Sequence, residues 1–233
     1  MVQRMLKMAE LRDPKETYPH VMRVAENSLE IYDRWAFDHN IPEHEKHCFR
    51  DCLKIAAKFH DIGKVGIPDA VLHSPKRYGP NDKNRAVLKS HTCIGAQIFG
   101  EGSSMLDSMC RDVALHHHEA WDKSPSGYPG NVDYRTYKIG EPLPPAEALG
   151  GEAIPLAARI ISVADVFDAL SHRRSYKDAW PPEKAFEEIE KGAGTQFDPE
   201  IVAAFLQVKS RIAAILLAYP DEESRPEEKG TSV

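Results

Sequence analysis

The chain has 233 residues, enough for one or two domains with a sizeable hydrophobic core. There are 30 Lys and Arg against 36 Asp and Glu, and the net charge of -6 gives no sign of electrostatic capture of a nucleic acid polymer or an anionic membrane. This length excludes a disulfide-stapled miniprotein, and the four cysteines, which have no CxxC spacing, are expected to be small buried residues. The N-terminus has no apolar signal segment and no run is long enough to span a bilayer, which predicts a cytoplasmic protein.

Apolar residues recur along the chain at intervals of three and four, the spacing of amphipathic helices, and no alternating strand pattern persists. The expected helices span residues 20–38, 45–61, 84–99, 104–118 and 154–170, with a shorter helix after Pro182 and a last one over 199–219. Gly63 is expected to end the second of these helices. The helix over 154–170 is apolar nearly all round and should be central and buried. The sequence therefore predicts an all-α fold.

One long loop and two terminal segments complete the expected organisation. Residues 123–155 hold six of the 17 prolines, and a loop of this length in a compact domain is usually functional or mobile. We expect residues 1–15 to form a lead-in helix or linker and residues 16–219 to form one helical domain. Residues 220–233 are polar and charged, and we expect a disordered acidic tail there.

Histidine is the residue type that stands out, because six of the 11 histidines lie in one short stretch, which indicates a metal site. An HD dipeptide such as His60-Asp61 is, alone, more often an exposed and solvated pair. His91, His117 and His118 fall on inward-facing stripes of two consecutive helices, where each buried ring needs a polar partner. One such ring is more typical of a hydrogen-bonded core histidine, whereas three together favour shared metal ligation.

Asp165 lies in the middle of the most apolar expected helix. An unpaired carboxylate there would be costly, so Asp165 must meet a cation. A buried salt bridge with Arg159 or Arg173 is one interpretation. A metal ion is the other, and it would explain Asp165 and the histidines together.

His20 opens the first long helix, and Glu16 lies four residues before it, so both can reach one ion if both are helical. Imidazole and carboxylate ligands without thiolates suit iron, manganese, nickel or zinc in an open catalytic site. The candidates are too many for one ion. We therefore expect two or three ions, with Asp61 as the bridge between them.

The ordered motifs of the chain resemble those of the HD-GYP family, a subset of the HD-domain metal-dependent phosphohydrolases. They run from Glu16 to Phe205 in family order. The matching strings are ETYPHVMRVAE, HDIGKVGIPD, HTCIGAQIF, HHHEAWD, SGYPG, IPLAARIISVADVFDAL, RSYKDAW and GTQFDPEIVAAF.

The resemblance implies that residues 16–219 are a compact helical HD-domain bundle that hydrolyses cyclic di-GMP to pGpG, and often on to GMP, by in-line attack of a metal-bridging hydroxide. It implies two or three divalent ions, iron or manganese before nickel or zinc. The implied metal ligands are Glu16, His20, His60, Asp61, His91, His117, His118 and Asp165. The implied substrate-binding residues are Lys64, Gly127, Tyr128, Asp168, Arg174 and Lys177, and the catalytic residues are Lys64 and Asp61.

Two departures from the family pattern lie beside Tyr128. Where the family has DGSGYP after the double histidine, this chain has DKSPSGYP, with two extra residues and one glycine fewer. A second insertion precedes Ile154. We expect metal binding to be intact and the re-routed loop to alter substrate preference or turnover, as a lid, by admitting another nucleotide, or by slowing catalysis.

Two alternative functions stay open from the sequence. One is a phosphohydrolase for another nucleotide, such as cyclic GMP-AMP, and the other is a low-turnover receptor or interaction module for a cyclic dinucleotide. A complete ligand set speaks against the receptor, because buried carboxylates and imidazoles are costly without metal. The expected partners are a cyclic dinucleotide and an upstream sensory domain or signalling protein, with no DNA or RNA polymer and no membrane.

Overall fold

The structure, a computed structural model, describes residues 2–13, 17–75, 78–102, 104–125, 127–172 and 180–220. All regular elements within these ranges are helices, which confirms the predicted all-α class. The α-helices are α1 (Val2–Arg12), α2 (Tyr18–Asp38), α3 (Glu43–Lys58), α4 (Asp69–Leu72), α5 (Lys83–Lys89), α6 (His91–Phe99), α7 (Met105–His116), α8 (Leu156–Ser171), α9 (Pro182–Lys191), α10 (Pro199–Gln207) and α11 (Lys209–Ala218). The 3-10 helices are η1 (Ile62–Gly66), η2 (Tyr134–Thr136) and η3 (Gly151–Ala153).

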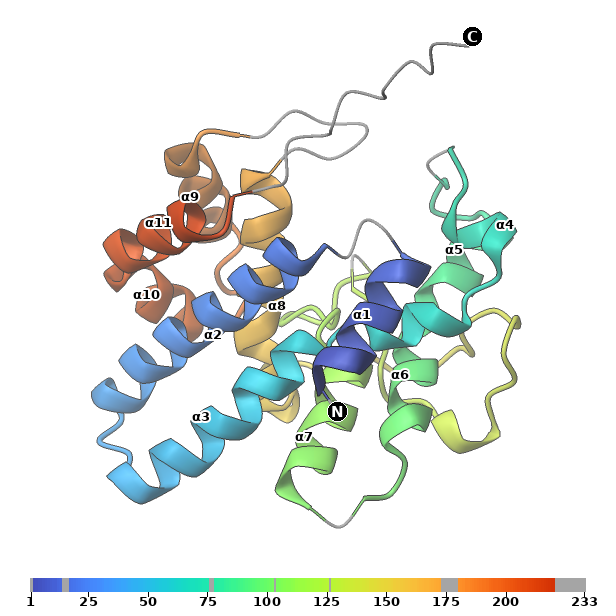
Figure 1. Ribbon diagram of the computed structural model, residues 1–233, viewed down its shortest axis with the longest axis horizontal. Helices are drawn as coiled ribbons and strands as arrows, with labels where there is room; N and C mark the ends of the chain where they lie inside the picture. The colour runs from blue at the N-terminus through green and yellow to red at the C-terminus, as the bar shows by residue number, and fades with distance from the viewer. Residues whose placement is uncertain are drawn as a thin grey trace, which may run out of the picture.

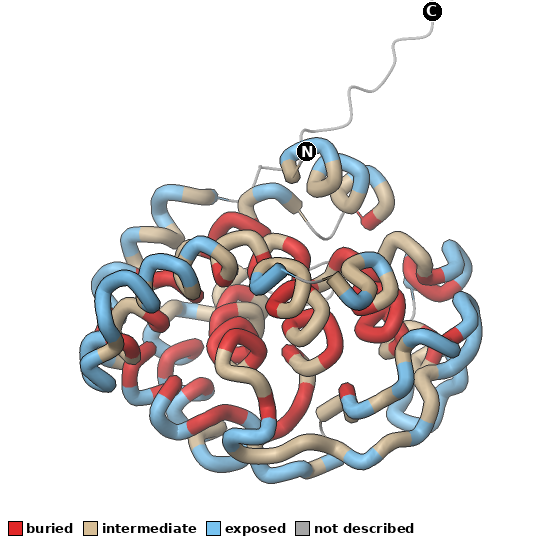
Figure 2. Tube along the Cα trace, turned by 90° about the horizontal axis from the view of Figure 1, so that it is seen from below, coloured by how far each residue is buried: buried red, intermediate tan, exposed pale blue. Residues whose placement is uncertain are grey.

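The helices form two groups that meet at the middle of the molecule (Figure 1). In one group, α2 packs against α3, α8, α10 and α11. In the other, α6 packs against α7 and η1, and α1 lies against η1. Contacts of α7 with α3 and α8 join the groups. Buried segments gather at the centre and exposed segments surround them, as Figure 2 shows.

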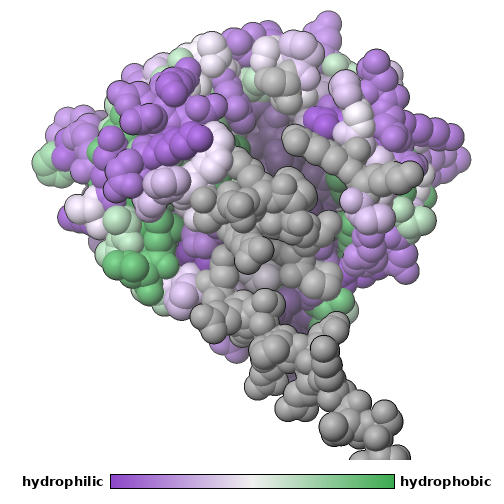
Figure 3. Space-filling model, turned by 90° about the horizontal axis from the view of Figure 1, so that it is seen from above, coloured by the Kyte–Doolittle hydropathy of each residue, from purple (hydrophilic) through white to green (hydrophobic). Residues whose placement is uncertain are grey.

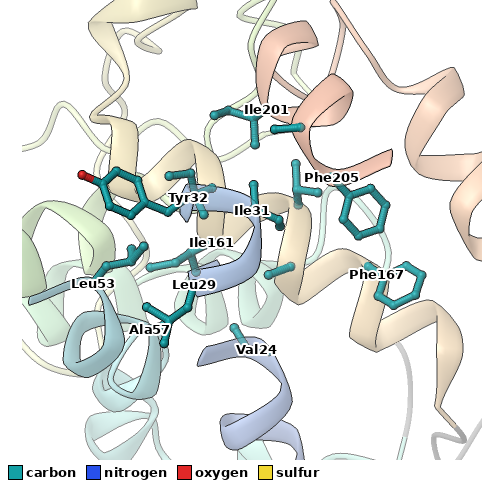
Figure 4. Close-up of a cluster of buried hydrophobic side chains, with 14 of the residues drawn as sticks. Val24, Leu29, Ile31, Tyr32, Leu53, Ala57, Ile161, Phe167, Ile201 and Phe205 are labelled. Carbon is teal, nitrogen blue, oxygen red and sulfur yellow. The ribbon is translucent and has the colours of Figure 1, made fainter. Parts of the chain in front are cut away.

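The main core lies between α2, α3, α8 and α10 (Figure 4). Leu29, Leu53 and Ile161 are almost fully buried in it. The ring centroids of Phe167 on α8 and Phe205 on α10 lie 5.1 Å apart. Because α8 is buried on several sides, as its composition predicts, this packing fixes it against α2 and thereby sets the distance between their polar side chains.

Helix α2 begins with a cap that places His20 in its first turn. The backbone N–H of His20 donates to the side chain of Thr17 at 3.4 Å. Pro19 lies in the first turn, where its missing N–H costs no hydrogen bond. The same device starts α10, where Asp198 accepts a hydrogen bond from the N–H of Glu200 and is followed by proline.

Three of the expected helices are shorter than their sequence periodicity indicates. Helix α3 ends at Lys58, and Gly63 is not its stop, because it lies inside η1 against the backbone of α6. The expected helix over 84–99 is broken at Ser90, whose hydroxyl donates to the carbonyl of Val87 and accepts from Tyr137 at 2.7 Å, in competition with the backbone. The expected last helix is two helices, α10 and α11, bent by 71°.

The loop over 123–155 contains only η2 and η3 as regular structure in its described part, as predicted. It is tied to the helices below it. The side-chain amide of Gln97 donates to the carbonyls of Tyr134 and Tyr137 at 2.8 Å, and the N–H of Leu143 donates to the carbonyl of Ala86 at 2.9 Å. The later part of the loop is therefore anchored on α5 and α6.

The cysteines agree only in part with the sequence prediction. Cys93 and Cys110 are buried, and burial raises the pKa of the Cys110 thiol to about 12, whereas Cys48 is exposed, contrary to expectation.

The face in Figure 3 is largely hydrophilic, with separated apolar patches. Among the described helices, none alone has the length and apolar composition to cross a bilayer, although the bent pair α10 and α11 meets that criterion by length and composition together.

Candidate metal centre

The expected metal ligands come together where the two helix groups meet. Two clusters of ligand atoms form, with the atoms in each lying within 4.8 Å of one another. The first cluster contains Asp61, His91, His117 and His118. The second contains His20, His60 and Asp165. Glu16, the remaining expected ligand, lies outside the described residues.

The histidine rings have the orientation that metal ligation requires. His60, His91 and His117 each place Nδ1 2.8 Å from a backbone carbonyl oxygen of the preceding helical turn. In the neutral ring, Nδ1–H donates to that carbonyl and the lone pair remains on Nε2. This backbone contact fixes both the tautomer and the direction in which Nε2 points.

Buried polar atoms in the first cluster test whether the residues fit a metal. Nε2 of His91 and of His117 lie 3.0 Å and 3.6 Å from Oδ1 of Asp61. All three atoms are buried and have no hydrogen-bond partner among the described residues. Facing lone pairs in a dry interior are unfavourable without a cation between them. The set therefore fits a divalent ion.

Asp61 joins the two clusters. Its Oδ1 faces the first cluster, while its Oδ2 lies 3.5 Å from Nε2 of His60. The Oδ1 of Asp165 is 3.8 Å from Nε2 of both His60 and His20. One carboxylate thus has an oxygen beside each group of candidate ligands. Arg159, one of the two arginines considered as a partner for Asp165, pairs with Asp198 at 2.5 Å instead. Arg173, the other, lies outside the described residues.

The protonation states suit ligation as well. Burial raises the pKa of the Asp61 carboxyl, but Lys64, whose Nζ is 2.6 Å from Oδ2, and the neighbouring imidazoles hold it well below its usual range. Burial lowers the pKa of His117 and, together with the adjacent rings, brings that of His118 well below its usual value. These shifts favour an ionised Asp61 and neutral rings at His117 and His118, the forms that bind metal.

Asp168 has a different environment from the substrate contact that the resemblance implies. Its side chain is 2% exposed, and its oxygens bond to Nε of Arg23 at 2.5 Å, Nδ1 of His20 at 2.7 Å and Nδ1 of His172 at 3.2 Å. A substrate would reach it only if this network opened. The bond to Nδ1 of His20 directs Nε2 of that ring toward Asp165, so the geometry gives Asp168 a positioning role.

Asp168→Asn is expected to lower the free energy of unfolding by about 3–5 kcal/mol, because the buried Arg23 would lose its counter-charge. Chemical denaturation would measure the change. Asp38→Asn is the matched control, since Asp38 pairs with Arg34 at the surface, where a helical ion pair contributes about 0.5 kcal/mol. Equal losses in the two variants would contradict the buried ion pair.

The inserted loop still delivers Tyr128 to the metal centre. The N–H of Tyr128 donates to the carbonyl of His118 at 2.8 Å, and the two ring centroids lie 4.5 Å apart. Gly127 permits this approach, because a Cβ there would lie 2.6 Å from the backbone nitrogen of Ala120. Tyr128 therefore lies against His118, one of the candidate metal ligands, and its contact with a substrate stays a prediction.

Sequence reasoning did not find two buried residues that hold the site together. Arg23 follows His20 on the buried face of α2, and an arginine in an otherwise apolar stripe is a signal for a buried partner. Glu119 directly follows the double histidine and accepts a hydrogen bond from the N–H of Gly130 at 2.6 Å. That bond ties the loop after Tyr128 to the end of α7. Arg174 and Lys177 lie outside the described residues.

Comparison with known proteins assigns the family. A family model described as HD domain matches residues 17–170, and a second HD domain model matches residues 140–201. The chain belongs to the HD domain family. The HD domain that the sequence motifs imply is therefore confirmed.

Curated relatives of this HD domain protein are phosphodiesterases by name. The chain is 36% identical over 219 residues to a Vibrio cholerae cyclic di-GMP phosphodiesterase, covering 92% of this chain and 40% of the relative. It is 34% identical to a Thermotoga maritima cyclic di-GMP phosphodiesterase, covering 93% and 51%. It is 34% identical to 3'3'-cGAMP-specific phosphodiesterase 2 of V. cholerae, covering 89% and 34%. The chain thus spans between 34% and 51% of the length of these relatives.

Solved structures share the fold. The HD domain of L. monocytogenes phosphodiesterase PgpH aligns with a TM-score of 0.55 at 21% identity, over 91% of this chain and 98% of that one. A cyclic GMP-AMP phosphodiesterase of V. cholerae aligns with a TM-score of 0.52 at 18% identity, over 94% and 56%. The helical bundle described above is therefore an HD-domain bundle.

Proposed function

We propose that this protein is a metal-dependent phosphodiesterase that hydrolyses a cyclic dinucleotide, with cyclic di-GMP as the first candidate substrate. The observation that carries the proposal is the pair of ligand clusters joined by Asp61, with buried lone pairs directed at common points. Relatives at 34–36% identity, which are named phosphodiesterases of cyclic dinucleotides, support it.

The candidate ligands would hold separate metal ions. Asp61, His91, His117 and His118 would hold one ion, His20, His60 and Asp165 a second, and Glu16 would add to His20 where a third is bound. Iron and manganese are the first candidates for such ligands, with nickel and zinc next. Bound there, divalent ions would polarise a phosphodiester and make water a nucleophile at neutral pH.

Lys64 is the proposed phosphate-binding and catalytic lysine. Its ammonium group lies against Asp61, at the edge of the first cluster, and its side chain is 20% exposed. A substrate phosphate at the metal ions would lie beside it, and the ammonium charge would offset the charge that develops on the phosphoryl oxygens. Arg174 and Lys177, which resemblance implies as further phosphate contacts, stay part of this proposal.

The relatives differ in the bases of the cyclic dinucleotides for which they are named. Relatives named for cyclic di-GMP and for 3'3'-cGAMP match this chain at similar identity, and the PgpH domain has been solved in complex with cyclic di-AMP. Cyclic GMP-AMP is therefore the alternative substrate. The chain spans 34% to 51% of the length of these relatives, and regulation by an upstream sensory domain or signalling protein is part of the proposal too.

The test is hydrolysis with defined metals. Protein purified without oxygen would be analysed for metal content and then incubated with cyclic di-GMP, cyclic GMP-AMP or cyclic di-AMP. We expect pGpG from cyclic di-GMP, loss of the reaction after chelation, and its return with manganese or ferrous iron. Tight binding without product from any of the three would contradict an enzyme and indicate a receptor. A faster reaction with cyclic GMP-AMP would show that this dinucleotide, and not cyclic di-GMP, is the preferred substrate.

A further inference from the structure

A lysine outside the expected site lies over the Tyr128 ring. Nζ of Lys89 is 4.3 Å from the centroid of that ring, which itself lies 4.5 Å from the ring of His118 and 6.4 Å from that of His91. Lys89 is the last residue of α5, two positions before His91. One aromatic ring therefore separates the ammonium group from the metal-binding imidazoles.

A second cation accompanies it. Arg85 lies one turn earlier on α5. Burial raises the pKa of the Tyr128 hydroxyl, the charges of Arg85 and Lys64 oppose that rise, and those of Asp61 and Asp165 add to it. Lys89 and Arg85 are each half-buried, and the charge of Arg85 lowers the pKa of Lys89. Lys89 therefore contacts the Tyr128 ring, and the charge of Arg85 acts on both residues.

These two cations have no carboxylate to neutralise them in the described part of the chain. Neither Lys89 nor Arg85 forms an ion pair there, and Arg85 donates only a long hydrogen bond of 3.4 Å, to the carbonyl of Tyr78. The carboxylates whose charges act on Tyr128, Asp61 and Asp165, belong to the ligand clusters. Local positive charge without a protein partner, next to a phosphate-binding centre, is typical of an anion subsite.

We propose that Lys89 and Arg85 form a second phosphate subsite, which binds the phosphodiester of the substrate that is not being cleaved. The inference rests on the proposed function, because a cyclic dinucleotide has two phosphodiesters and the metal centre with Lys64 engages only one. Tyr128 holds Lys89 in place through the cation–π contact. The loop that departs from the family pattern thereby acts on substrate binding through a lysine on α5.

The experiment compares two substrates of different phosphate number. Wild type and Lys89→Gln would be assayed with cyclic di-GMP, which has two phosphodiesters, and with bis(p-nitrophenyl) phosphate, which has one. We expect kcat/KM for the cyclic dinucleotide to fall about tenfold or more, mostly through KM, since a charged hydrogen bond to phosphate is lost. The loss for the one-phosphate substrate should be several-fold smaller.

Two further variants control the comparison. Lys83→Gln removes the same charge from the exposed first residue of α5, and both substrates should react as with wild type. Lys89→Arg should recover most of the lost affinity. Equal losses on both substrates in Lys89→Gln would show that Lys89 only positions Tyr128 and would overturn the subsite, as would an unchanged KM for the cyclic dinucleotide.

The subsite and the proposed function can fail separately. If wild type cleaved bis(p-nitrophenyl) phosphate but no cyclic dinucleotide, the proposed function would be wrong. Calorimetric titration of wild type and Lys89→Gln with cyclic di-GMP would then decide the subsite alone. A Kd about tenfold weaker in the variant supports it, and equal affinity or no binding overturns it.

Discussion

Asp61→Asn is expected to reduce the proposed phosphodiesterase activity severely while the helical fold stays intact. An amide has one acceptor oxygen and no charge, so it cannot present an oxygen to both ligand clusters as the carboxylate does at 3.0 Å and 3.5 Å. It also loses the ion pair with Lys64. Even outer partners of metal ligands contribute about 10–100-fold, so we expect kcat/KM to fall roughly 10³-fold or more.

Metal content separates this effect from misfolding. Elemental analysis should find fewer ions per chain in Asp61→Asn, with the circular dichroism of wild type. Asp112→Asn makes the same change on α7, where Asp112 pairs with Arg111 away from the clusters, and it should keep both metal and activity. A full complement of metal in Asp61→Asn would rule out the bridging role.

The fold class and most of the residues that meet in the two ligand clusters could be predicted from the sequence, because both depend on local patterns. Helical periodicity is a property of neighbouring residues, and the caps of α2 and α10 are readable from Thr17 and Asp198. The buried character of α8 follows from its composition. Several inward-facing histidines need a shared cation in any packing of the helices. His91 and His117 could therefore be predicted as candidate metal ligands before the packing was known.

The parts that could not be predicted depend on contacts between distant segments. The resemblance implies Asp168 as a substrate contact, and only the approach of α2 to α8 makes it the partner of Arg23 and His20. Lys89 lies inside the helix expected over 84–99, and no local pattern there predicts its contact with the Tyr128 ring. The break at Ser90 depends on Tyr137, 47 positions later in the chain.

Gly63 shows the same limit most clearly. A glycine after an apolar helix is typical of a C-terminal cap, and the sequence assigns that role to it. In the structure, glycine is needed at this position because the backbones of η1 and α6 approach each other closely. A Cβ at this position would lie 1.9 Å from the carbonyl oxygen of His91 and 2.5 Å from the backbone nitrogen of Gly95. These are backbone atoms of a buried helix, so no side chain can rotate to make room.

Gly63→Ala is therefore expected to lower the free energy of unfolding by more than about 4 kcal/mol. Losses of this size are exceptional, and we expect one here because the added methyl group would overlap buried backbone atoms. The helix that must move carries His91 at its first residue, so metal content should fall in the protein that still folds. Chemical denaturation and elemental analysis would measure the two effects.

Gly79→Ala is the matched control, because a Cβ there meets no atom within 4 Å, and its stability should stay within about 0.5 kcal/mol of wild type. A small loss in Gly63→Ala with full metal content would mean that η1 can withdraw from α6 without cost. Loss of both stability and metal would instead show that Gly63, two residues after the HD dipeptide, sets the position of His91, 28 positions away, through backbone contact alone.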